Sequence, residues 1–126
     1  MKKALVLTNG LYQTSDAKTA HGLVRGSERF LIAGIIDNTQ TANKDAGELL
    51  DSTHRNIPVF ADLAAALSTI KDADTLIIGV ATVGGKLPVE MLVIIKEAIS
   101  KGLSIVNGLH DYLNEHADLV ELALKN

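Results

Sequence analysis

Five short apolar runs rich in β-branched residues recur along the 126-residue sequence and constrain its fold more than any other feature. They lie at residues 4–7, 30–36, 57–60, 76–80 and 103–106. Each run is continuous rather than alternating, which is typical of strands covered on both faces, as parallel strands in α/β proteins are. The runs therefore predict five buried strands.

Segments with helical periodicity separate these runs. They lie at residues 16–25, 62–70, 88–101 and 113–124. The clearest is 62–70, in which apolar residues recur at i, i+3, i+4 and i+7 after Asp62, a residue type favoured as N-cap. Pro88 in a first turn and Gly102 as a stop delimit the third. Strands and helices therefore alternate along the chain.

This alternation predicts parallel strands joined by right-handed crossovers, which is a three-layer Rossmann-like α/β sandwich. The expected sheet has about five strands in the order 3-2-1-4-5, in one domain over residues 1–126. The core should include the following residues: Leu5, Leu7, Ile32, Ile35, Val59, Leu67, Ile77, Ile78, Ile95, Ile105 and Val106.

The connection at residues 38–56 is polar and rich in Thr, Asn and Asp. Only residues 45–50 within it show part of a helical stripe. The connection is either a mobile flap over a site or a plain solvated linker, and the pattern alone leaves both interpretations open.

Charge and composition exclude several classes of function. Twelve Lys and Arg against 15 Asp and Glu give a net charge of −3, the wrong sign for a nucleic-acid-binding chain. The longest apolar runs hold about seven residues, where a membrane span needs about twenty. No targeting segment is recognisable, and the absence of cysteine fits a reducing compartment, so a cytoplasmic location is expected.

Ligands of such a sheet bind beyond the carboxyl ends of its strands, and the loop after the first strand is the first candidate. It contains neither a dinucleotide fingerprint nor a P-loop pattern, so no cofactor is indicated. Lys18 and Thr19 follow Asp16, an N-cap candidate, and could hold a carboxylate or phosphate in the first helical turn. Alternatively, Lys18 is a solvated lysine and Thr19 a capping residue.

Two further loops carry candidates. Asp37 ends the second strand, where a dinucleotide-binding fold places a ribose-binding carboxylate, although such an Asp is also a common turn former. Gly84 and Gly85 free the backbone to face a ligand, and Lys86 adds a charge, although a tight turn would explain them as well. We expect Lys18 and Lys86 to face one concavity between the loops after the first and fourth strands.

His110 and Asp111 follow the fifth strand and would lie on the rim of that concavity. A histidine beside a carboxylate can act as a general base, while an Asp before a helix is more simply its cap. His21 lies near Lys18 on the first helix, and His54 and His116 are expected to be exposed. No histidine pair has the spacing of a zinc site, so no metal site is predicted.

Taken together, the loops resemble a known family. The segments that carry the resemblance include D-A-K-T-A-H-G-L-V-R, L-I-I-G-V-A-T-V-G-G-K-L-P and I-V-N-G-L-H-D-Y-L. They are similar to the N-terminal Rossmann-like domain of the domain-of-unknown-function 1611 family, over residues 3–122. Some members are linked to N-acetylation of D-glutamate and carry a C-terminal P-loop domain, which these 126 residues do not include.

The resemblance implies that this domain supplies the substrate- or nucleotide-facing half of a larger acyltransferase- or ligase-like enzyme and is inactive alone. The alternatives are a free-standing anion- or nucleotide-binding regulatory module and a structural or oligomerisation domain. The partner would be a small anionic metabolite or nucleotide, with no nucleic acid and no membrane. The resemblance extends the ligand-site expectation to the following positions: Lys18, Thr19, His21, Asp37, Gly84, Gly85, Lys86, His110 and Asp111.

Overall fold

The computed structural model describes residues 2–80 and 88–107, and all five expected strands lie within them. The strands are β1 (Lys2–Leu7), β2 (Phe30–Ile36), β3 (Val59–Phe60), β4 (Thr75–Ile78) and β5 (Ser104–Asn107). All pairings are parallel, in the order β3-β2-β1-β4-β5. The predicted Rossmann-like sheet is confirmed.

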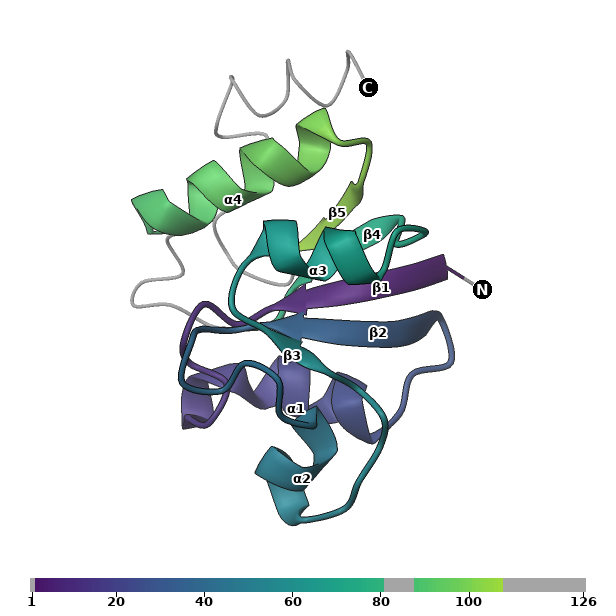
Figure 1. Ribbon diagram of the computed structural model, residues 1–126, viewed down its shortest axis with the longest axis vertical. Helices are drawn as coiled ribbons and strands as arrows, with labels where there is room; N and C mark the ends of the chain where they lie inside the picture. Colours follow the sequence, from purple (N-terminus) through teal and green to yellow (C-terminus); the bar gives the residue numbers. More distant parts are fainter. Residues whose placement is uncertain (1, 81–87, 108–126) are drawn as a thin grey trace.

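Four α-helices connect these strands. They are α1 (Lys18–Arg25), which follows the 3-10 turn η1 (Ser15–Ala17), α2 (Ala46–Asp51), α3 (Leu63–Thr69) and α4 (Val89–Ser100). Because the crossovers are right-handed, α1 and α2 lie on one side of the sheet and α3 and α4 on the other (Figure 1). None of the helices within the described ranges has the length and apolar character needed to cross a bilayer.

The core forms where alternate side chains of β1 meet the two helical layers. Val6 lies on the α1 side, where a Cβ added at Gly79 would be 2.4 Å from Val6 Cγ1 and 3.0 Å from Ala20 Cβ. Gly79 therefore lets α1 pack closely on the sheet. Of the predicted core residues, Leu67, Ile105 and Val106 are only partly buried, whereas the others are buried.

The helix ends confirm two of the sequence predictions and correct a third. Asp62 caps α3 by accepting the N–H of Ala65 at 2.8 Å, and Gly102 ends α4 with a φ of +88°. Asp16 was expected to cap the first helix, which is wrong: the chain enters α1 through η1, whose cap is Thr14. The hydroxyl oxygen of Thr14 accepts the N–H of Asp16 at 3.2 Å.

The polar connection at residues 38–56 is attached to the rest of the fold at several points. Asp45 caps α2 by accepting the N–H of Glu48, and it also accepts the N–H groups of Arg55 and Ile57, at 2.8–3.0 Å. Its backbone pairs with Pro58 as an isolated bridge. These bonds fold the segment back on itself, so the structure favours a structured, solvated connection over a free flap.

Candidate functional site

Asp37 accepts hydrogen bonds from several groups at the carboxyl-terminal ends of the strands. Its side chain is buried at the end of β2, and Oδ1 accepts hydrogen bonds from the Thr8 hydroxyl at 2.7 Å and from the N–H groups of Gly10 and Tyr12 at 2.8 and 3.1 Å. The Thr41 hydroxyl donates to Oδ2 at 2.6 Å. Both carboxylate oxygens are thus engaged within the protein, which favours the structural interpretation of Asp37 over the ribose-binding one.

The loop that Asp37 holds also holds Tyr12. The Tyr12 side chain is fully buried, and its hydroxyl donates to the carbonyl of Ala46 at the start of α2, at 2.7 Å. Burial raises the pKa of Tyr12 to about 12. The carbonyl of Tyr12 accepts a hydrogen bond from Nε2 of His21 at 2.5 Å, and the two rings meet edge to face with centroids 5.3 Å apart. Tyr12 therefore links the loop after β1, α1 and α2.

The candidate site is a cleft of about 550 Å³ along α1, hereafter the α1 cleft. Its lining residues come from the loop after β1, from η1 and from one face of α1, and they are the following: Gln13, Thr14, Ser15, Lys18, His21 and Arg25. The last three recur at i, i+3 and i+7, which places them on the same face of the helix. The described residues of the α1 cleft thus combine two cations, an imidazole and two hydroxyl groups, and none of these lining residues is a carboxylate.

The structure separates some of the predicted site residues. Lys18 and His21 line the α1 cleft together, whereas Thr19 lines a different, largely apolar cavity of about 420 Å³. Thr19 is inside α1 and does not cap it, because the helix begins after Ala17 without a side-chain cap. Arg25 was missed by the sequence analysis, although its i+7 spacing from Lys18 is visible in the sequence.

Five predicted site residues lie outside the described residues: Gly84, Gly85, Lys86, His110 and Asp111. The expected juxtaposition of Lys18 and Lys86 therefore stays a prediction. The α1 cleft lies beside the loop after β1, which is one of the two walls that the sequence analysis expected.

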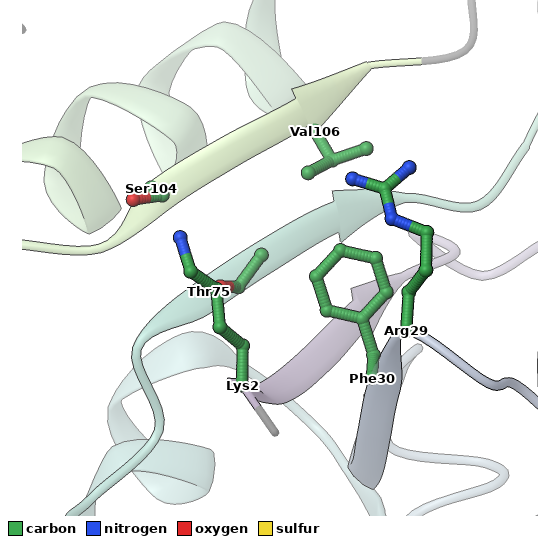
Figure 2. Close-up of a pocket in the computed structure, with 6 residues that line it drawn as sticks. All are labelled: Lys2, Arg29, Phe30, Thr75, Ser104 and Val106. Atoms are coloured by element: carbon green, nitrogen blue, oxygen red, sulfur yellow. The ribbon is translucent and has the colours of Figure 1, made fainter.

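Another cavity, of about 300 Å³, lies at the amino-terminal ends of the strands (Figure 2). It is lined by the first residues of β1, β2, β4 and β5 together with Arg29 and Val106. The Arg29 guanidinium lies over the ring of Phe30, 5.2 Å from its centroid, in a cation–π contact. Because ligands of such folds bind at the carboxyl ends of the strands, this amino-terminal edge is a poorer candidate than the α1 cleft.

Asp45, Glu48 and His54 form a group that the histidine spacing did not reveal. One possible ligand atom from each lies within 4.8 Å of the others, a geometry that could hold a metal ion. Nδ1 of the exposed His54 contacts Glu48 Oε2 at 2.8 Å and lies 3.9 Å from Asp45 Oδ2. The hydrogen bond to Glu48, aided by Asn56 and Asp45, raises the pKa of His54, which favours an ion-paired imidazolium here.

The fold places the chain in the Rossmann-like class of α/β domains. The chain belongs to the family described as a Rossmann-like domain of unknown function, DUF1611_N, whose family model matches residues 39–126. A crystal structure of a DUF1611 family protein from Anabaena variabilis superposes with a TM-score of 0.83 and 30% sequence identity, over 96% of this chain and 33% of that one. The resemblance seen in the loop segments is thereby confirmed.

Two curated proteins match shorter segments. A D-glutamate N-acetyltransferase from Pseudoalteromonas sp. is 46% identical over 54 residues, which is 43% of this chain and 16% of that protein. A D-glutamate N-acetyltransferase from Tritonibacter scottomollicae is 39% identical over 51 residues, or 40% of this chain and 15% of that protein. The matched segments thus span about a sixth of these relatives, and the structural match about a third of its neighbour.

Proposed function

We propose that this domain binds a small anionic metabolite in the α1 cleft and serves as the ligand-binding part of an acyltransferase-like protein. The observation that carries the proposal is the lining itself, in which Lys18 and Arg25 face one cavity and no carboxylate stands among the described lining residues. An anion entering this cleft would meet two positive charges at once.

The two cations are available for a ligand. Neither Lys18 nor Arg25 takes part in an ion pair with any residue of the described ranges. Ser15 adds a hydroxyl group at the same rim, and a hydroxyl can donate to an anionic oxygen. The Thr14 hydroxyl already donates to the carbonyl of Leu11 at 2.7 Å. Arginine in particular pairs with carboxylates in a bidentate geometry, so a carboxylate suits this lining well.

The relatives suggest which carboxylate to test. They are D-glutamate N-acetyltransferases, so the metabolite that we propose is an acidic amino acid such as D-glutamate. Seven residues of α-helix rise about 10 Å, so Lys18 and Arg25 approach the cleft from opposite ends. A molecule with two carboxylates can engage both side chains, whereas a monocarboxylate can engage them only by sharing one group.

We expect binding without turnover from the 126-residue chain. The matched segments span about a sixth of the length of those relatives, so we do not expect this domain to supply their whole active site. Acyl transfer would therefore depend on the remainder of a full-length protein.

The experiment is calorimetric titration of the 126-residue chain with D-glutamate, and with acetyl-CoA and ATP as other anions. Lys18→Ala and Arg25→Ala should each weaken D-glutamate binding about tenfold, as the loss of one charge-assisted contact does. Lys101→Ala is the matched control, because it removes an exposed lysine at the end of α4, on the other side of the sheet. Equal affinity in all four proteins, or binding of none of the anions, would overturn the proposal.

A further inference from the structure

The hydrogen bond between His21 and Tyr12 determines which ring nitrogen of His21 carries a proton. Nε2 lies 2.5 Å from the carbonyl oxygen of Tyr12. A carbonyl oxygen can only accept, so the proton of this bond is on Nε2. In the neutral imidazole the other nitrogen, Nδ1, is then unprotonated and carries a free lone pair.

Nδ1 is free to serve a ligand. It has no hydrogen-bond partner among the described residues. Because no side-chain N or O atom of those residues is both buried and unpartnered, Nδ1 is accessible. His21 itself lines the α1 cleft with Lys18 and Arg25. An acceptor is thus present beside two side chains that can only donate.

The support beneath His21 keeps this arrangement rigid. Tyr12 is held at its N–H by Asp37 at 3.1 Å and at its hydroxyl by Ala46 at 2.7 Å, and its ring packs at 84° against the imidazole. Gln13 and Ser15 also carry acceptor atoms, but both side chains are exposed, and the Thr14 oxygen already accepts the N–H of Asp16. Of the acceptors without a partner in the described lining, Nδ1 of His21 is the one that is positioned before a ligand arrives, which lowers the entropy that binding must overcome.

We propose that His21 is the specificity-determining residue of the α1 cleft, and that its Nδ1 accepts a hydrogen bond from an N–H of the ligand. The cleft then selects an anion that also carries an amino group over the same anion without one. This inference rests on the proposed function, because it assigns a role within the same cleft. It goes beyond that function, since two cations alone would favour any dianion and would repel an ammonium group.

The test compares D-glutamate with glutarate, which has the same two carboxylates on the same five-carbon chain but no amino group. The parent chain should bind D-glutamate about tenfold more tightly, the worth of one hydrogen bond to a charged group. His21→Gln can still donate to the Tyr12 carbonyl but has no acceptor at the Nδ1 position. This variant should bind both ligands equally, with glutarate affinity close to that of the parent.

A nitrogen-15 NMR measurement gives a readout that a merely structural role would not move. At a pH at which the ring is neutral, Nδ1 of His21 should carry no proton in the free protein, and its signal should shift on addition of D-glutamate but not of glutarate. If His21→Gln kept the preference for D-glutamate over glutarate, or if the neutral ring carried its proton on Nδ1, the inference would be overturned. The proposed function would still stand in that case, provided that both ligands bound in a manner that depends on Lys18. If neither ligand bound the parent, the proposed function itself would fail.

Discussion

The hydroxyl of Thr8 donates a hydrogen bond to Oδ1 of Asp37 at 2.7 Å, and both side chains are buried. Thr8 follows β1 and Asp37 follows β2, so this contact joins the ends of two neighbouring parallel strands. The same oxygen accepts the N–H of Tyr12, whose carbonyl positions His21. The geometry of the α1 cleft thus depends on a carboxylate that does not line it.

Asp37→Asn should destabilise the domain for two reasons. The amide loses the carboxylate charge that strengthens these hydrogen bonds, and its NH₂ group would face groups that donate to Asp37. We expect the free energy of unfolding to fall by about 2 kcal/mol, in the range measured for hydrogen bonds to buried charged groups. Urea denaturation followed by circular dichroism measures it. Asp72→Asn is the control, because Asp72 is exposed and its ion pair with Lys3 lies at the surface. A similar loss in both variants would contradict this role of Asp37.

Two glycine substitutions should change stability in opposite directions. Gly22 is in α1, and an added Cβ would meet nothing within 4 Å, so Gly22→Ala should raise the free energy of unfolding by about 0.5–1 kcal/mol. Gly79→Ala should lower it by about 1–3 kcal/mol, because its Cβ would overlap Val6 between the sheet and α1. Thermal unfolding of the two variants beside the parent checks the prediction, and a stabilising Gly79→Ala would refute the close packing of α1.

The stability of the domain should fall at alkaline pH because of Tyr12. Burial raises its pKa from 10.0 to about 12, so between these values the unfolded chain has lost the proton that the folded chain keeps. Stability from this group is therefore complete below pH 10 and is lost as the pH rises through 12, by about 3 kcal/mol in all. Denaturant unfolding across this pH range measures the loss. In Tyr12→Phe, the part of the loss that comes from Tyr12 should be absent.

A spectroscopic titration tests the same group directly. Tyr12 and Tyr112 are the two tyrosines of the chain, so Tyr112→Phe leaves Tyr12 as the sole phenol signal. Its absorbance should report ionisation near pH 12. Ionisation near pH 10 while the protein remains folded would contradict the burial of Tyr12.

Glu48→Gln should lower the pKa of His54, because the hydrogen bond to the Glu48 carboxylate is the largest cause of its rise. A raised histidine pKa means that the contribution to stability is present at low pH and is lost as the pH rises through the folded-state pKa. NMR titration of the His54 ring protons measures the change. Glu90→Gln, on α4, should leave the His54 titration unchanged. An equal change of the His54 pKa in both variants would contradict a specific pair of His54 and Glu48.

The strands and their order could be predicted from the sequence because both depend on local pattern and on general rules of handedness. Continuous apolar runs such as residues 30–36 indicate strands buried on both faces, and right-handed crossovers then restrict the order. Asp62 and Gly102 marked helix ends correctly, since capping involves residues only a few positions apart. Asp16 did not, because a 3-10 turn moved the cap back to Thr14.

What the sequence by itself determined was the fold class, the family and the presence of a cation and a histidine on the first helix. Only the tertiary structure decided that Asp37 is engaged by the chain itself, that Thr19 and Lys18 line different cavities, and that Tyr12 orients His21. The physical reason is the separation in sequence between the residues that interact. Helical spacing places Lys18 and His21 on one face, but the bonds that give the α1 cleft its chemistry join residues from different loops, and no local pattern encodes which partners packing brings within hydrogen-bond distance.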